Sequence, residues 1–133
     1  AMANIPIHNL AHTFGARYGI PHGLANAVLM PSVLRSMPQL YTPKVNEFSR
    51  ALGVEPNHGD SQETLEHCIE AIVELRSSIN LPEDFSEYSI SAGEIPAIVP
   101  AVQDDPSALS FRIPEDIIAK VAQEVIGSKV GVQ

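Results

Sequence analysis

The sequence has few of the features that mark secreted or membrane-spanning proteins. Its single cysteine, Cys68, excludes an intrachain disulfide and a cysteine-rich zinc site. No uncharged stretch has the length and apolarity of a membrane span, and the start has no basic segment before an apolar run, as a secretory signal would require. We therefore expect a cytoplasmic protein that does not bind a membrane.

Basic residues are also scarce. Eight lysines and arginines stand against sixteen acidic residues, which gives a formal net charge of -8. A charge of this sign repels a phosphate backbone, so the sequence predicts no nucleic-acid partner and favours a small molecule or a protein instead. With 133 residues the chain has the size of one ordinary domain. We expect a single helical domain over residues 1–133.

Acidic residues are absent from the first third of the chain. All sixteen lie from Glu47 onward, and the only fixed charges before Lys44 are Arg17 and Arg35. This neutral segment is rich in Leu, Ile, Val and Ala, and a helix that is apolar nearly all round is normally buried. We expect residues 8–34 to lie at the centre of the protein, with the acidic remainder as a more solvated covering.

Strand signals are weak, because alternating patterns are scarce and no Asn-Gly or Asp-Gly turn joins two alternating runs. Apolar residues recur at helical spacing instead, which predicts an all-α bundle of about six helices joined by short loops. We expect helices over residues 8–18, from residue 22 with a kink or break at Pro31, over residues 42–53, from residue 60 to about 79, briefly after residue 91, and over residues 114–127.

Three patterns predict how helices begin. Thr42, followed by a proline, is typical of an N-cap, and the pairs Asp60 with Glu63 and Ser91 with Glu94 resemble capping boxes. Residues 80–90 are expected to form a polar turn region with little helical drive. The helix that follows Asp60 is expected to carry on its apolar side Leu65, Cys68, Ile69, Ile72, Val73 and residues 75–79.

Three of the five histidines, His8, His12 and His22, lie within fifteen positions. The first two are one helical turn apart and share a face, and the turn at residues 19–21 can direct His22 towards the same region. Gly23 is expected to let another group approach the backbone closely. The spacing alone leaves three alternatives open: a metal site, proton transfer, or three unrelated packing histidines.

A metal bound by imidazoles would be Zn, Fe, Ni or Cu. Three histidines with one open position would suffice for a hydrolytic zinc site, so a free-standing three-histidine hydrolase is one alternative. A non-catalytic helical interaction or oligomerisation module is another. No acid in the first 46 residues is available to orient the rings, so the groups that orient them must come from elsewhere.

The segment HNLAHTFGARYGIPHGLANAVLMPSVLR, residues 8–35, resembles the signature of the iron-containing (group III) alcohol dehydrogenases. Two histidines four apart, Gly15, the Pro-His-Gly triplet at 21–23 and the small-apolar run after it all fall at that family's spacing. The resemblance implies an NAD(P)-dependent oxidoreductase that interconverts an alcohol and an aldehyde or ketone. The family has a nucleotide-binding domain and an all-helical metal domain, and this chain resembles the later part of the helical one.

By position, the resemblance implies that His8 and His22 are metal ligands, for Fe(II) or in some members Zn(II). It implies that His12 is a histidine that binds no metal, lies near the nicotinamide and relays the hydroxyl proton. NAD(P) would belong to the complete enzyme, and no residue of this chain is assigned to binding it. The family's other two metal ligands, an Asp and a His four residues apart on an earlier helix, have no counterpart in this sequence.

Two ligands of four hold a metal weakly, so we expect the isolated chain to be inactive and to bind metal weakly or through a symmetric partner. We also expect an exposed apolar patch over residues 8–34 and, as its consequence, a homo-oligomer. Of the remaining groups, Phe14 and Tyr18 are expected to line a substrate pocket or to belong to the core. Structural or solvated roles are expected for His58, His67, Cys68 in the core, and an acidic helix face of Glu63, Glu66, Glu70 and Glu74.

Overall fold

The computed structural model describes residues 5–57 and 59–127. Over these residues it contains no strand, and six of its α-helices have eight residues or more, which confirms the predicted all-α class. The elements in chain order are α1 (Ile5–Tyr18), α2 (His22–Ser36), α3 (Pro38–Tyr41), the 3-10 turn η2 (Thr42–Lys44), α4 (Val45–Leu52), α5 (Ser61–Ser78), η3 (Ser86–Tyr88), η4 (Ala92–Glu94), α6 (Ile95–Gln103), η5 (Pro106–Leu109) and α7 (Glu115–Ile126).

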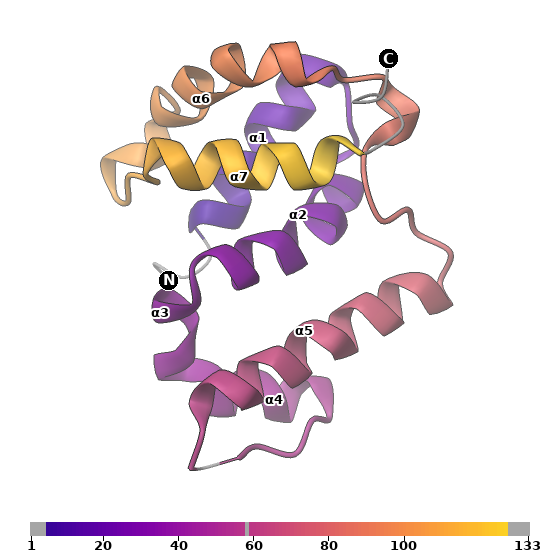
Figure 1. Ribbon diagram of the computed structural model, residues 1–133, viewed down its shortest axis with the longest axis vertical. Coiled ribbons are helices and arrows are strands. Elements are labelled where there is room, and N and C mark those ends of the chain that lie inside the picture. Colours follow the sequence, from indigo (N-terminus) through magenta and orange to yellow (C-terminus); the bar gives the residue numbers. More distant parts are fainter. Residues whose placement is uncertain (1–4, 58, 128–133) are drawn as a thin grey trace.

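Helix α2 occupies the centre of the molecule, where it packs against α1, α5 and α7 (Figure 1). Helix α4 packs on α5 at one end, and α6 packs on α7 at the other. Leu10, Leu29, Leu65, Ile98 and Ile118, one from each of five helices, are wholly buried in the core. Each such side chain contributes about 1.5–3 kcal/mol on burial. The neutral segment therefore lies at the centre, as its lack of charge predicts.

Helix α1 ends at the predicted glycine. Gly19 adopts the left-handed φ of 69°, and its amide donates to the carbonyl of Gly15 at 2.9 Å. Helix α2 starts at His22 and continues through the buried Pro31 to Ser36, so the predicted interruption is not found. Proline has no N–H to donate to the carbonyl four residues earlier, that of Ala27. Arg76 of α5 supplies the missing donor, with its Nη1 3.4 Å from that oxygen.

Helix α4 ends as predicted at Gly53, which has a φ of 72°. Its start differs from the prediction, because Thr42 opens the 3-10 turn η2 and α4 begins only at Val45, without a side-chain cap. Asp60 does cap α5, since its Oδ1 accepts from the amide of Glu63 at 3.1 Å. The reciprocal half of this capping box is absent: the amide of Asp60 already donates to a carbonyl in the preceding loop, and the Glu63 carboxylate accepts from a loop asparagine.

The buried side of α5 differs from the prediction over its last turns. Leu65, Cys68 and Ile72 are buried as expected. Leu75 and Ile79, expected on the apolar side, are each 57% exposed. Arg76 takes the inward position instead, because it faces the carbonyl of α2 that Pro31 leaves without a helical donor.

Residues 80–90 are more than a polar turn. Phe85 and Ile90 are buried, and the amide of Phe85 donates to the carbonyl of Val125 at 2.7 Å, which attaches the segment to α7. The predicted capping box of Ser91 with Glu94 is wrong, because Ser91 makes no side-chain cap and the Glu94 carboxylate turns to α1. Helix α6 therefore follows a 3-10 turn. Helix α7 starts after Pro114 and ends before Gly127, as predicted.

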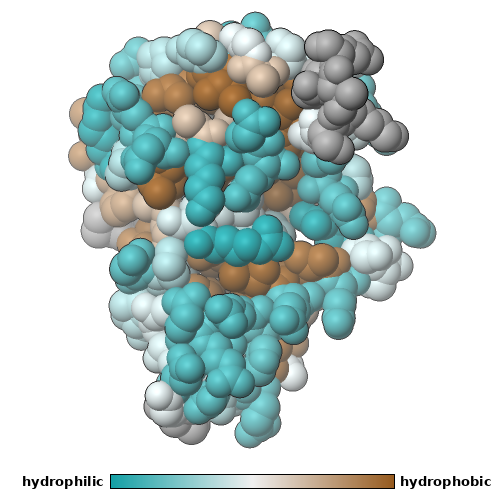
Figure 2. Space-filling view, in the orientation of Figure 1, coloured by the Kyte–Doolittle hydropathy of each residue, from teal (hydrophilic) through white to brown (hydrophobic). Residues whose placement is uncertain are grey.

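The surface of residues 8–34 carries no exposed large apolar side chain; those found in the described part of the chain are Leu75, Ile79 and Leu109. The predicted apolar patch over residues 8–34 is therefore wrong, because the other helices cover the apolar sides of α1 and α2. Figure 2 shows hydrophilic side chains over much of one face, with apolar strips between α6 and α7 and beside α5. Among the described residues, no helix combines the length and the apolarity needed to cross a bilayer.

Candidate metal centre

The turn after α1 folds back against the end of that helix, so that the backbone at Ile20 passes close to Gly15. A β-carbon placed on Gly15 would lie 3.1 Å from the carbonyl oxygen of Ile20, so a glycine here gives the returning chain its room. Pro21 continues the return in an extended conformation before α2 begins. Gly23 has no neighbouring atom within 4 Å of its β-carbon position. Within the chain the close approach is therefore at Gly15, while the backbone at Gly23 is open, and the expected approach of another group there stays a prediction.

This return places the rings of His8 and His22 side by side. Their centroids are 5.8 Å apart and their planes differ by 7°. His8 projects from the first turns of α1, and His22 is the first residue of α2. Both side chains are exposed. Two imidazoles fourteen residues apart in sequence thus share one small region of the surface.

The donor set and its spacing fit a transition-metal ion. Imidazole nitrogen is a common ligand of Fe(II) and Zn(II) and binds Zn at about 2.1 Å, so two rings on one ion have centroids roughly 4.5–5.5 Å apart. The centroids of the His8 and His22 rings, 5.8 Å apart, are slightly farther from each other than this. The two rings stack nearly in parallel, so binding one ion requires the side chains to rotate until both direct a nitrogen to it. Exposure of both rings leaves room for further ligands.

His12 points to a different partner. Its Nδ1 donates to Oδ2 of Asp105 at 2.5 Å, across 93 positions of sequence. Asp105 follows α6 and precedes η5, so the orienting acid that the first 46 residues lack comes from the other end of the chain. The His12 side chain is 67% exposed and that of Asp105 is 11% exposed. A ring held at Nδ1 by a carboxylate keeps Nε2 available for proton transfer.

The structure therefore brings two of the three candidate histidines together and directs the third to a carboxylate. Across the part of the chain that the structure describes, no group of three or more His, Cys, Asp or Glu side chains is arranged to hold a metal ion. This arrangement does not fit the three-histidine hydrolase, which needs His8, His12 and His22 on one ion. It fits a pair of metal donors beside a separate proton-transfer group.

The remaining candidates are structural or solvated in the structure. Cys68 is buried, and its burial raises the pKa of the thiol. His67 is exposed, with Nε2 4.0 Å from the carboxylate of Glu63 on the same helix. His58 lies outside the described residues. The row of acidic residues on α5 is exposed, as predicted for a solvated helix face: Glu63, Glu66, Glu70 and Glu74.

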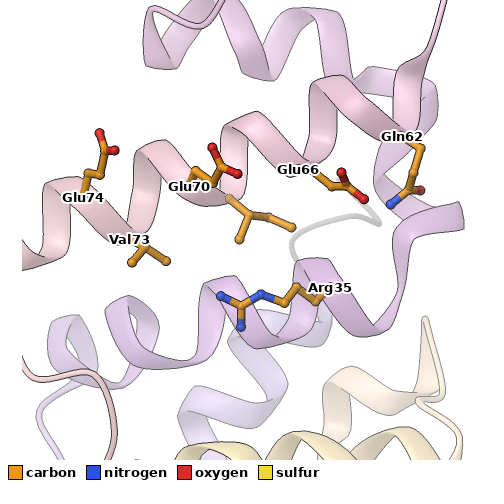
Figure 3. A pocket seen from close by; sticks show the side chains of 7 residues that line it. Arg35, Gln62, Glu66, Glu70, Val73 and Glu74 are labelled. Atoms are coloured by element: carbon orange, nitrogen blue, oxygen red, sulfur yellow. The ribbon is translucent and has the colours of Figure 1, made fainter.

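An open groove lies between α2 and α5, away from the histidines. It encloses about 570 Å³ above an apolar floor of Ile69 and Val73. Figure 3 shows Arg35 reaching from α2 along the groove, while Glu70 and Glu74 project from the far side of α5. None of the three candidate histidines lines this groove, so it is not the site of the predicted chemistry.

Phe14 and Tyr18 have separate roles. Phe14 is wholly buried and its ring packs 5.2 Å from that of Phe85, so it belongs to the core. Tyr18 is half-buried, and its hydroxyl donates to Oε1 of Glu94 at 2.9 Å. Burial raises the pKa of Tyr18. This hydrogen bond joins the end of α1 to the start of α6.

Sequence reasoning missed two residues near the histidines. Asp105 follows the predicted short helix after residue 91, and nothing in the sequence signalled its pairing with His12. Asn9, next to His8, is 1% exposed, and neither atom of its amide group has a hydrogen-bond partner. A buried amide without a partner is unusual in native proteins.

Comparison with known proteins extends the sequence resemblance. Residues 1–126 match the model of the Fe-containing alcohol dehydrogenase family, C-terminal region. Lactaldehyde reductase of Escherichia coli (strain K12) is 31% identical over 99 residues, which cover 74% of this chain and 26% of the relative. The 1,3-propanediol dehydrogenase of Citrobacter freundii is 28% identical over 104 residues, covering 78% of this chain and 27% of the relative. The chain spans about a quarter of each.

Solved structures agree. A crystal structure of 1,3-propanediol oxidoreductase superposes with a TM-score of 0.72 at 26% identity, covering 90% of this chain and 32% of that one. An alcohol dehydrogenase from Oenococcus oeni reaches the same TM-score at 24% identity and supports the fold alone. The matched family model, the similar sequences and the shared helical fold show that this chain belongs to the iron-containing alcohol dehydrogenases, as part of their C-terminal region.

Proposed function

We propose that this chain is the C-terminal, metal-binding portion of an NAD(P)-dependent dehydrogenase that interconverts a small alcohol and the corresponding aldehyde or ketone. Family membership supports the reaction class, since relatives are named for lactaldehyde and 1,3-propanediol. The observation that carries the proposal is the convergence of the His8 and His22 rings, 5.8 Å apart, at an exposed point of the α1–α2 turn.

In this proposal His8 and His22 bind Fe(II) or Zn(II) through their ring nitrogens. When bound, the ion would polarise the substrate oxygen as a Lewis acid, and NAD(P) in the complete enzyme would supply or accept hydride. His12 holds or releases the hydroxyl proton at Nε2, the nitrogen that does not bind Asp105. The three imidazoles thus divide the work between binding the ion and moving the proton.

Two neutral imidazoles bring no negative charge to a divalent ion, and water has to fill the remaining coordination positions. We therefore propose that metal binding by the chain alone is weak and that the chain alone does not oxidise or reduce a substrate. The remaining ligands and NAD(P) belong to the complete enzyme. The homo-oligomeric assembly and the cytoplasmic location expected from the sequence stay predictions.

The test is a titration of the chain with Zn²⁺, followed by NMR of the histidine ring nitrogens. Ring signals of His8 and His22 are expected to shift together with one common affinity. His8→Ala and His22→Ala are each expected to weaken the response of the other ring about tenfold or more, because the second donor no longer acts at high local concentration. His12→Ala is the matched control and is expected to leave the affinity unchanged.

Other outcomes separate the alternatives. Equal loss of affinity with all three alanine variants would favour the three-histidine hydrolase. No shift of any ring at millimolar zinc would favour the helical interaction module and contradict the proposal. A second test replaces the matching C-terminal segment of the Escherichia coli relative with this chain and measures reduction of lactaldehyde. His22→Ala is expected to abolish activity that this fusion shows.

A further inference from the structure

The hydrogen bond between His12 and Asp105 spans 93 positions of the sequence. It joins α1 to the loop that follows α6, and its two partners differ sharply in exposure. The ring is open to solvent, while the carboxylate is nearly enclosed by the protein. A hydrogen bond to an ionised carboxylate is stronger than one between neutral groups, so Asp105 can hold the ring even though the ring itself lies at the surface.

The backbone around Asp105 is held in place from both sides. The amide of Asp104 donates to the carbonyl of Pro100 at 2.8 Å, and the amide of Ala108 donates to the carbonyl of Asp105 at 2.9 Å. Helix α1 packs against both α6 and η5, the elements that flank this loop. The carboxylate therefore has a defined position relative to α1, as a group that orients a side chain must have.

We infer that Asp105 is a positioning residue that keeps the neutral His12 ring in its Nδ1–H form. A neutral imidazole has one donor and one acceptor nitrogen, and an ionised carboxylate only accepts. The proton must then sit on Nδ1, and Nε2 is left as the proton acceptor on the exposed part of the ring. The use of Nε2 on a substrate proton rests on the proposed function, whereas the tautomer does not.

The sequence supplies a matched control in the preceding residue. Asp104 carries the same charge in the same loop, is exposed, and lies one position from Asp105. Asp104→Asn and Asp105→Asn therefore remove equal charge from nearly the same place. Only the second changes the group that accepts from His12. A general electrostatic effect would alter the ring in both variants, and a positioning effect would alter it in one.

The experiment is ¹⁵N NMR of the histidine rings at about pH 9, where imidazole is neutral. In the unsubstituted chain the His12 signals are expected to show Nδ1 protonated and Nε2 unprotonated. Asp105→Asn is expected to lower the ratio of the Nδ1–H to the Nε2–H form about fivefold or more, the size of effect that one charge-assisted hydrogen bond has. Asp104→Asn is expected to leave the ratio unchanged, and Asp105→Glu to restore most of it.

An Nε2–H ring in the unsubstituted chain would overturn the inference, whether or not any variant folds. Equal changes in the two asparagine variants would overturn it as well. The zinc titration separates this inference from the proposed function. If Asp105→Asn changes the His12 tautomer but no zinc response is found at His8 and His22, the positioning role stands and the metal proposal fails. If His8 and His22 respond to zinc but Asp105→Asn leaves the His12 tautomer unchanged, the metal proposal stands and the positioning role fails.

Discussion

The helix pairs α4–α5 and α1–α2 differ in how the hydrogen-bonding groups of their buried polar side chains are satisfied. In the α4–α5 pair, the buried Ser49 hydroxyl donates to a helix carbonyl at 2.8 Å, and the buried Thr64 hydroxyl accepts from the amide of Asn57 at 2.8 Å. In the α1–α2 pair, the buried amide of Asn9 has no partner, and neither has the Oδ1 atom of Asn26. These buried polar groups of the α4–α5 pair therefore have partners within the chain, whereas some of those in the α1–α2 pair have none.

Charge follows the same division. Helix α5 carries its acidic residues on an exposed face, while α1 and α2 contain no acidic residue and expose three histidines. Buried polar groups without partners concentrate where a protein uses its structure for function. The difference indicates that α4 and α5 chiefly stabilise the fold, whereas α1 and α2 also carry the residues of the candidate site.

The largest loss of stability is expected for Phe14→Ala, which tests whether the α1–α2 pair, despite its unpaired amides, contributes to the core. Phe14 is wholly buried against Phe85, so Phe14→Ala is expected to lower the free energy of unfolding by about 3–5 kcal/mol. Leu75→Ala on α5 is the control, because its side chain is largely exposed, and a change within about 0.5 kcal/mol is expected. Urea denaturation measures both. Similar losses in the two variants would contradict the described burial.

Local patterns predicted much of the fold but not its long-range contacts. Gly19 and Gly53 end their helices as the sequence indicated, because a left-handed glycine stop depends on neighbouring residues. The inward position of Arg76 was not predictable from helical spacing. It follows from a proline on another helix, which leaves a carbonyl that only a distant donor can reach.

The candidate site shows the same limit. The pairing of His8 with His22 was expected from the turn between them, and the structure places their rings together, although their role as ligands stays a prediction. Helical spacing suggested that His12 shares their face, but gave no sign of Asp105, which is 93 positions away. Contacts across such a separation depend on how α6 and α1 pack, and no local pattern records that packing.

A second prediction concerns the replacement of a buried polar side chain by an apolar one. This change is expected to raise the free energy of unfolding in the α1–α2 pair and to lower it in the α4–α5 pair. Asn9→Leu replaces an unpartnered amide with an apolar group of nearly the same shape, and an increase in the free energy of unfolding of about 1–2 kcal/mol is expected. Thr64→Val leaves the amide of Asn57 without its acceptor, and a decrease of about 1–3 kcal/mol is expected. Thermal and urea unfolding measure both. A loss of stability in Asn9→Leu would show that the amide has a partner.

A third prediction tests the bond that joins the two pairs, from Arg76 on α5 to the carbonyl of Ala27 on α2. Arg76→Met is expected to cost about 0.5–1.5 kcal/mol more when Pro31 is present than in the Pro31→Ala background. The reason is that Pro31→Ala restores a helical N–H for the same carbonyl. A double-mutant cycle in urea measures this coupling. Equal costs in both backgrounds would mean that Arg76 is held inward by something other than Pro31.

The smallest change in stability is expected for Gly15→Ala, which tests whether the positions of the His8 and His22 rings can change while the α1–α2 pair stays folded. In Gly15→Ala the new methyl group meets the carbonyl of Ile20 at 3.1 Å, while alanine favours the helix by about 0.5–1 kcal/mol, so the net change in stability is expected to stay below about 1 kcal/mol. The returning chain has to shift outward, which moves His22 relative to His8 and weakens the common zinc response. Gly23→Ala, at an open position, is the matched control and is expected to keep that response. An unchanged zinc affinity in Gly15→Ala would mean that the convergence of the two rings does not depend on the close crossing. The difference between the α4–α5 and α1–α2 pairs would then have no basis in that crossing.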